Sequence, residues 1–322
     1  MTDFSQTLFH CSSLYSILTS NKKKNSMQLY REAVAEMEEK NRMFDKLKKK
    51  DGPMGNKYLD KIEELSILIP KLEVMKDAEE PLSDGCKSFL ATVYAREKYG
   101  KWSISKDIGS RETQKGKEVE VDSIKLVEEL DDIKLNVNGT RVENEWFSGL
   151  IDAYEGENII GATKIHDVKS PWDIETFLTN VTRVLPQLYY WQMQGYMDLT
   201  DAKVAEVHFC LVNTPVRFMK DAVDAAMRSG NYATTESPEY KKAEAEIINN
   251  MIFDDIPKDE RRIKFIVQRN DEDIETAHKR VEKCREYLSE LEKLHLNFDF
   301  TVTSRSFDSN MPYSAPNQVN HE

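Results

Sequence analysis

Apolar residues recur at helical intervals through the first third of the chain. In the segment 26–49, Leu29, Val34 and Met37 stand three to five positions apart among many charged residues, and Asp51-Gly52-Pro53 ends the pattern. This periodicity, closed by a glycine and a proline, predicts an amphipathic helix. Similar patterns predict further helices at about 56–78, 84–98 and 113–129.

The pattern changes at Asn136, where short β-prone runs begin. Asn138-Gly139 favours a tight turn, and the aromatic run 145–154 and the run 163–169 each predict a strand. Ser170-Pro171-Trp172-Asp173 then has the proline and the S-x-x-D capping pattern of a helix start. The remaining patterns predict strands at 204–212 and 263–267, and helices at about 186–199, 216–228, 238–252 and 271–294.

These elements indicate one α/β domain in which helices pack on a sheet formed by the second half of the chain. Residues 1–110 are expected to form a helical N-terminal elaboration of this domain, and residues 111–300 its core. The tail 303–322 is rich in Ser, Asn and Pro and has few side chains to bury, so we expect it to be disordered.

Composition indicates a soluble protein. Hydrophobic residues make up 39% and charged residues 32%, which is normal for a globular chain. No run approaches the roughly 20 apolar residues that span a bilayer, and the first residues lack a secretory signal, so we expect a cytoplasmic location. The four cysteines stand far apart and form no C-x-x-C pair, which favours reduced, structural cysteines over a metal site.

The net charge of −12 argues mildly against a nucleic-acid partner. Phosphate binding needs lysines and arginines at the contact surface and does not require a basic total, because the release of counterions is local. A nucleic-acid function therefore has to be argued from a site.

One D-x-K segment has the context of such a site. The pattern itself carries no information, because it also occurs at Asp132 and Asp201. In Asp167-Val168-Lys169, however, it lies on a predicted strand, so Asp167 and Lys169 share one face while Val168 points into the core. A turn between Gly156 and Gly161 would pair this strand antiparallel with the preceding one and bring Asp152 nearly opposite Asp167.

Two carboxylates that face one point repel each other unless a cation lies between them. Mg²⁺ prefers such oxygen ligands, and a neighbouring ammonium can orient a water molecule. The alternative is a surface hairpin with ordinary ion pairs, and the hairpin alone does not decide between them. Gln192 and Tyr196, four residues apart on one face of the next predicted helix, favour the metal site, since they can hold a phosphate or a water; they would also suit a half-buried helix face.

The ordered motifs resemble a known family. The series Gly149-Leu150-Ile151-Asp152, Asp167-Val168-Lys169-Ser170 and Gln192-Met193-Gln194-Gly195-Tyr196 is similar to the PD-(D/E)XK nuclease superfamily. Within it, the resemblance is to phage recombination exonucleases of the lambda-exonuclease and YqaJ type, which share a Q-x-x-x-Y element with RecB nuclease domains. It implies a restriction-endonuclease-like α/β core with a central mixed β-sheet flanked by helices. Ile151 replaces the family's proline, and Asp167 its commoner glutamate.

The resemblance implies a Mg²⁺-dependent DNA exonuclease, with Mn²⁺ able to substitute, that hydrolyses phosphodiester bonds from duplex ends in the 5′-to-3′ direction during phage-type homologous recombination. Lys169 would orient or help deprotonate the attacking water, and Gln192 would position that water or the scissile phosphate. The implied metal ligands are Glu120, Asp152, Asp167 and the carbonyl of Val168.

The resemblance also implies substrate contacts and partners. Its substrate-binding residues would be His10, Ser12, Gln194 and Tyr196. Because His10 stands where the family has an arginine, we expect a modest 5′-phosphate preference that increases below the imidazole pKa of about 6.5. The implied partners are double-stranded DNA, a single-strand annealing protein and further copies of this chain, without a membrane.

Two other functions remain open on the sequence. One is a structure-specific or restriction-type endonuclease with the same catalytic centre, because the shape of a substrate is read by surfaces around such a centre. The other is a non-catalytic DNA-end-binding recombination scaffold. The intact set of two acids and a lysine argues against the scaffold, since these groups serve little purpose together without a metal.

Overall fold

The computed structural model describes residues 2–19, 26–47, 50, 52–76, 81–103, 109–230 and 234–297. The tail from Thr303, predicted to be disordered, lies outside the described residues. Within the described part of the chain, every helix is too short or too polar to cross a lipid bilayer.

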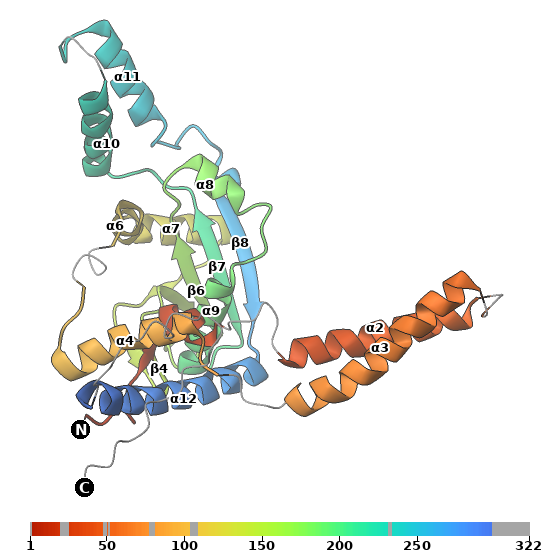
Figure 1. The fold of residues 1–322 in the computed structure, drawn as a ribbon. Coiled ribbons are helices and arrows are strands. Elements are labelled where there is room, and N and C mark those ends of the chain that lie inside the picture. Colours follow the sequence, from red (N-terminus) through yellow and green to blue (C-terminus); the bar gives the residue numbers. More distant parts are fainter. Residues whose placement is uncertain are drawn as a thin grey trace, which may run out of the picture.

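A five-stranded mixed sheet forms the centre of the molecule (Figure 1). The central strands β6 and β7 are parallel, whereas the other neighbouring strands are antiparallel. Helices cover both faces, which confirms the predicted fold class and explains why β6 and β7 are buried along nearly their whole length. In sheet order the strands are β2 (Asn136–Val137), β5 (Ala153–Glu155), β6 (Lys164–Lys169), β7 (Val204–Cys210) and β8 (Arg262–Gln268).

A second, three-stranded sheet corrects two sequence-based predictions. It consists of β1 (Phe9–His10), β4 (Phe147–Gly149) and β3 (Val142–Glu143). The N-terminal third is therefore not purely helical, and the run 145–154 forms two strands in different sheets. The break falls at residues 150–152, where Ile151 turns into the core and is fully buried.

The turn at Asn138-Gly139 joins β2 to β3, which belong to different sheets, so it does not close the hairpin that the dipeptide favours. Asn138 instead ties this crossover to the strand break. Its amide nitrogen Nδ2 donates to the carbonyl oxygen of Ile151 at 2.9 Å, and its backbone N–H donates to that of Asp152 at 3.0 Å.

Two groups of helices cover the opposite faces of the central sheet. The helix α7 (Glu120–Asp131) packs on β6 and β7 from one side, over a small core that includes Val127, Val168 and Cys210. The other side carries the larger core, which includes Val207, Phe209 and Met193. Its helices are α1 (Leu14–Leu18), α4 (Asp84–Tyr99), α9 (Gln187–Thr200) and α12 (Asp271–Leu296).

The single helix predicted at 113–129 is divided. The helix α6 (Arg111–Glu118) ends before the buried Val119, and α7 follows. The bend accompanies the burial of Lys115, whose Nζ donates to the carbonyl oxygens of Pro171 and Trp172 at 2.8 and 3.0 Å. Those carbonyls are thereby held outside a helix.

The helix predicted to begin near Ser170 therefore starts later. The observed helix α8 (Ile174–Thr179) is capped by Asp173, whose carboxylate accepts from the backbone N–H of Thr176 at 2.7 Å.

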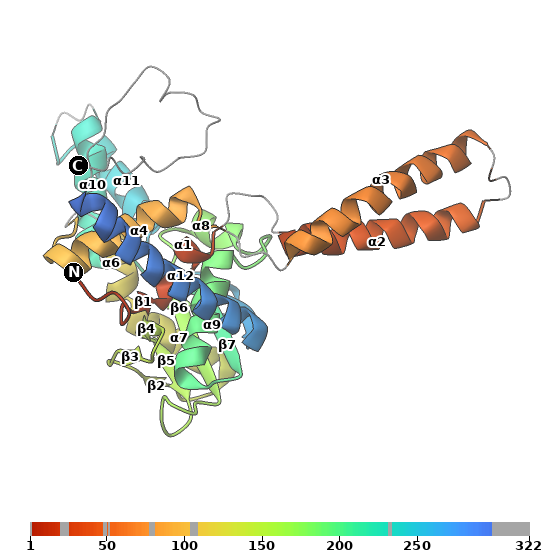
Figure 2. The same cartoon turned by 60° about the horizontal axis from the view of Figure 1, so that its bottom comes forward.

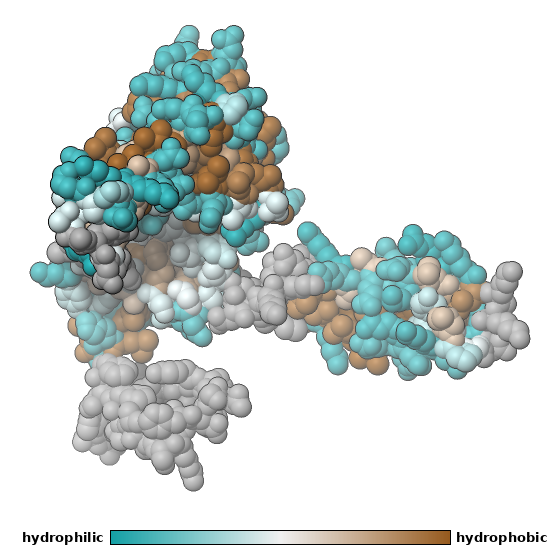
Figure 3. Space-filling view, turned by 90° about the horizontal axis from the view of Figure 1, so that it is seen from above, coloured by the Kyte–Doolittle hydropathy of each residue, from teal (hydrophilic) through white to brown (hydrophobic). Residues whose placement is uncertain are grey.

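Two long helices form a hairpin that points away from the rest of the molecule (Figures 1 and 2). These are α2 (Ser26–Asp45) and α3 (Pro53–Lys76), which contact each other along their lengths. The hairpin surface mixes hydrophilic and hydrophobic side chains (Figure 3), with Met54, Ile67 and Val74 more than half exposed. The remaining elements are η1 (Cys11–Ser13), α10 (Val216–Ser229), α11 (Pro238–Asn249) and η2 (Lys258–Arg261).

Two glycines allow α9 to approach its neighbours closely. A Cβ atom on Gly195 would lie 2.6 Å from Leu14 Cδ1 and 2.9 Å from Cys11 Sγ. A Cβ atom on Gly149 would lie 2.7 Å from the ring of Tyr196. The glycines of the G-L-I-D and Q-M-Q-G-Y motifs thus set how closely α9 packs against β4 and the N-terminal segment.

We expect Gly195→Ala to lower the free energy of unfolding by about 1–3 kcal/mol, because overpacking a filled core forces side chains to shift. Gly116→Ala is the matched control: it is also helical, but its added methyl meets no atom within 4 Å. The control should instead stabilise the protein by up to about 1 kcal/mol. Chemical denaturation measures both, and equal effects of the two changes would contradict the close approach at Gly195.

Candidate active site

Asp152, which immediately precedes β5, lies opposite Asp167 on β6, as predicted. The antiparallel register pairs Ala153 with His166, which sets the residues on either side, Asp152 and Asp167, opposite each other. The Oδ2 atom of Asp152 accepts the backbone N–H of Val168 at 2.8 Å. Asp167 is only 1% exposed, and its Oδ2 pairs with Nζ of Lys169 two residues further along the same face.

The proximity of these charges changes their pKa values. Burial, followed by repulsion from the Asp167 carboxylate, raises the pKa of Asp152 to about 8. Burial alone would favour the neutral amine of Lys169, but attraction to Asp167 and Asp152 outweighs it, and the pKa of Lys169 rises. The site therefore holds a firmly protonated lysine beside a carboxyl group that readily takes up a proton.

Glu120 borders this group from the first turn of α7. It is half-buried, and burial raises its pKa, while Lys169 acts in the opposite direction. Glu118, by contrast, is exposed, and its Oε2 accepts from Nε of Arg217 at 2.5 Å. Of the two glutamates around the helix break, Glu120 is the one whose charge interacts with Asp167 and Lys169.

Gln192 and Tyr196 support the site from α9. Gln192 Nε2 lies 3.3 Å from Oδ1 of Asp167 and 2.9 Å from the Tyr196 hydroxyl, to both of which it donates. That hydroxyl donates in turn to the carbonyl oxygen of Leu150 at 2.8 Å. Tyr196 is almost fully buried, so the structure does not support the expected contact with substrate. Its role is structural, because it links α9 to the strand break that carries Asp152.

Gln194 does not join the acidic residues. It is 1% exposed, and its side-chain amide bonds to the backbone carbonyl of Gln268 and the backbone N–H of Asn270, at 2.8 and 2.9 Å. Two residues along a helix correspond to about 200° of rotation, so Gln192 and Gln194 point in different directions. The expected substrate contact of Gln194 is replaced by a link between α9 and the end of β8.

The N-terminal segment places His10 between two arginines. β1 pairs with β4 so that His10 lies beside Ser148. The two ring nitrogens of His10 face guanidinium groups: Nε2 lies 3.4 Å from Arg96 Nη1, and Nδ1 lies 3.1 Å from Arg141 Nη1. These arginines come from α4 and from the residue before β3, and no local sequence pattern marks either of them.

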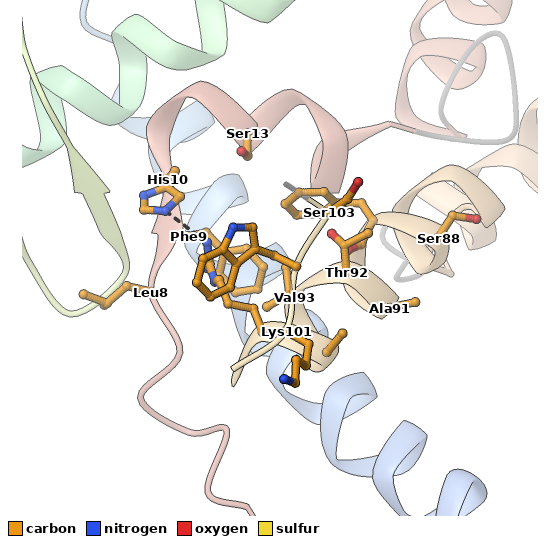
Figure 4. Close-up of a pocket in the computed structure, with 14 residues that line it drawn as sticks. Leu8, Phe9, His10, Ser13, Ser88, Ala91, Thr92, Val93, Lys101 and Ser103 are labelled. Atoms are coloured by element: carbon orange, nitrogen blue, oxygen red, sulfur yellow. Dashed lines mark hydrogen bonds between the residues drawn. The ribbon is translucent and has the colours of Figure 1, made fainter. Parts of the chain in front are cut away.

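His10 lines a cavity of about 1130 Å³ between the N-terminal segment and α4 (Figure 4). Ser13 lines it as well, whereas Ser12, the serine expected to bind substrate, is exposed and is not among the lining residues. Burial and the two arginines lower the pKa of His10. His10 therefore does not gain its charge just below pH 6.5, where the sequence led us to expect it. The positive charge beside it comes from Arg96 and Arg141 instead.

The other D-x-K segments carry ordinary ion pairs, and the cysteines lie in the core. Lys203 pairs with Asp201 at 3.3 Å on the surface, and Lys134 pairs with Glu128. All four cysteines are free and buried, and Sγ of Cys86 lies 3.9 Å from Sγ of Cys284.

The fold of this chain is similar to that of a solved exonuclease structure. No family model matches this chain, and neither does any curated protein. Among solved structures, a phage-related exonuclease from Haemophilus somnus 129PT aligns with a TM-score of 0.56 and 22% identity, over 90% of this chain and 97% of its own. This chain shares the fold of that exonuclease. An alkaline exonuclease from Laribacter hongkongensis overlaps less, with a TM-score of 0.45 and 15% identity over 66% of this chain and 85% of its own.

The pKa of Asp152 leads to an expectation for the metal-free protein. A carboxyl group whose pKa is raised on folding contributes stability that is complete below its unfolded value, 3.8, and is lost as the pH rises through about 8. Asp152→Asn keeps a hydrogen-bond acceptor but carries no charge. In chelator, the variant should therefore be more thermostable than the natural chain at pH 8, with the difference shrinking toward pH 4. A difference that does not change with pH would refute the raised pKa.

Proposed function

We propose that this protein is a Mg²⁺-dependent DNA exonuclease of the PD-(D/E)XK superfamily, of the kind found in phage recombination. The observation that carries the proposal is the facing pair Asp152 and Asp167, with Lys169 on the same face of β6. The fold shared with a phage-related exonuclease is consistent with it.

The donor set suits a hard cation. Glu120, Asp152 and Asp167 offer carboxylate oxygens and Val168 a backbone carbonyl, the ligand types that Mg²⁺ and Mn²⁺ prefer. Oδ2 of Asp167 is buried against the ammonium of Lys169, which supplies its neighbouring positive charge. When bound, a divalent cation would activate a water molecule and neutralise charge on the phosphate.

The residues of the chain have distinct tasks in this proposal. Lys169 keeps its proton, so it suits orienting the attacking water and stabilising negative charge on the phosphorane better than removing a proton itself. Gln192 holds Asp167 through Oδ1 and is near enough to position the water or the scissile phosphate. Tyr196 fixes Gln192 and the strand break together.

The two arginines beside His10 suit a DNA terminus. Arg96 and Arg141 converge on His10, and guanidinium groups bind phosphate oxygens in a planar, two-pronged geometry. β4 ends three residues before Asp152, so the strand pair β1–β4 leads from this cluster toward the carboxylates. We infer that a 5′-phosphate binds here and that its binding depends on the arginines.

The proposal extends to partners. Double-stranded DNA is the substrate, and a single-strand annealing protein is the partner that 3′ single-stranded products require. Assembly with further copies of this chain, which the resemblance implies, belongs to the same proposal. A structure-specific endonuclease with the same centre is the alternative to be distinguished.

Lys169→Met should abolish DNA cleavage while leaving Mg²⁺ and DNA binding within a few-fold of the natural chain, because the lysine is not a metal ligand. The chain provides a matched control in Lys203→Met, which alters an exposed D-x-K pair and should leave cleavage unchanged. Cleavage rates with a fluorescent duplex, together with a binding titration in Ca²⁺, measure both effects. Substantial cleavage by Lys169→Met would refute the assignment.

Linear duplex DNA should be resected in Mg²⁺, with early loss of a label at the 5′ terminus and no reaction in chelator. Covalently closed circles should resist, because they offer no end. Arg96→Gln together with Arg141→Gln should reduce the preference for a 5′-phosphorylated end over a 5′-hydroxyl end. Nicking of closed circles at the rate of linear duplex would favour the endonuclease instead.

A further inference from the structure

The face of the central sheet opposite Asp167 carries a buried cluster that the proposed reaction does not use. The parallel register of β6 and β7 pairs His166 with Glu206 and Val168 with His208. Side chains alternate along a strand, so His166 points away from Asp167, toward the α7 side. His166 and His208 are 0% exposed, and Glu206 is 3% exposed.

Three possible ligand atoms converge within this cluster. His166 Nδ1 lies 3.0 Å from His208 Nε2, and Glu206 Oε2 lies 3.3 Å from His208 Nε2 and 3.7 Å from His166 Nδ1. Among the residues that the structure describes, no other three His, Cys, Asp or Glu side chains bring their ligand atoms within 4.8 Å of one another. Zn²⁺ bonds of about 2.0–2.1 Å in a tetrahedron give ligand separations of about 3.3 Å, which these distances bracket.

Glu155 orients one of the two imidazoles. Its Oε1 lies 3.0 Å from His166 Nε2, which places the ring proton on Nε2 and leaves the lone pair of Nδ1 facing the centre of the cluster. A carboxylate that accepts the outer N–H of a histidine is the usual companion of a metal-bound imidazole, because it fixes the tautomer and the ring orientation.

A metal-free hydrogen-bond network satisfies this cluster only in part. His208 Nε2 can carry one proton, which it can donate either to His166 Nδ1 at 3.0 Å or to Glu206 Oε2 at 3.3 Å. When it donates to His166, Oε2 of Glu206 is left without a hydrogen bond. A buried carboxylate oxygen without a hydrogen bond is costly. This Oε2 belongs to a side chain that is almost fully buried and faces both imidazoles.

Two lysines pair with the carboxylates around the cluster. Lys164 pairs with Glu206 Oε1 and with Glu155, each at 3.1 Å. Lys264 lies 3.7 Å from Glu206 Oε2 and also pairs with Asp131. A bound cation would compete with Lys264 for Oε2, so removal of that lysine should strengthen the binding of a metal.

We propose that His166, His208 and Glu206 form a second metal site, for a borderline divalent cation such as Zn²⁺. Two imidazoles and one carboxylate suit Zn²⁺ and exclude Mg²⁺ as the preferred ion, because Mg²⁺ favours oxygen ligands alone. The site joins the two central strands and is independent of the proposed nuclease activity.

The test is zinc retention by the full chain. Protein equilibrated with Zn²⁺ and desalted into buffer with excess Mg²⁺ should keep about one zinc per chain, measured by elemental analysis. Glu206→Gln and His208→Asn should weaken zinc binding at least about tenfold. Lys264→Gln should bind zinc more tightly than the natural chain.

Two matched controls should retain the zinc. His278→Asn removes a histidine that pairs with a different carboxylate, Asp198, at 2.9 Å, and Asp167→Asn alters the proposed Mg²⁺ centre. Zinc K-edge absorption of the natural chain, which needs no variant to fold, should report two imidazole nitrogens. Less than stoichiometric zinc in the natural chain, a spectrum without imidazole ligands, or equal zinc in Glu206→Gln would each overturn the proposal.

Discussion

The buried pair between Asp167 and Lys169 is the interaction on which the candidate site depends. A carboxylate this far from water is tolerated only when a charge or hydrogen bonds replace its hydration. Lys169 meets one oxygen, and Gln192 meets the other from α9. Because Gln192 is itself held by Tyr196, and Tyr196 by the carbonyl of Leu150, the ion pair is tied to the strand break that presents Asp152.

The part of the site that lies on one hairpin could be predicted from the sequence. Alternation along β6 put Asp167 and Lys169 on one face, and the two glycines of the connection brought Asp152 opposite, each with a positive φ angle that favours glycine. The strand break itself could not be predicted in this way. Its cause is tertiary: Ile151 enters the core, and the ring of Tyr196 lies against Gly149, so the chain leaves one sheet for the other there.

Local sequence patterns could not predict the residues that reach the site from distant segments. Arg96 and Arg141 converge on His10 across 86 and 131 positions of sequence, and nothing in the local pattern of either arginine indicates this. Gln194 shows the opposite limit. A polar residue between Gln192 and Tyr196 resembles a further site residue, yet the rotation of the helix turns it to the backbone of Gln268. Periodicity shows which residues share a face, whereas packing decides what that face meets.

The position of β6 in the sheet explains why polar groups on both of its faces need partners. A central strand paired in parallel with β7 is covered by helices on both sides, so neither face is left to water. Asp167 on one face and His166 on the other are therefore both buried, one residue apart. The partners of these buried groups differ between the two faces. On the α9 side they are carboxylates, an amide and a lysine, and on the α7 side they are imidazoles with a glutamate. Because the first set offers oxygen ligands and the second mainly nitrogen, the thickness of one sheet separates a centre suited to a hard cation from one suited to a softer cation.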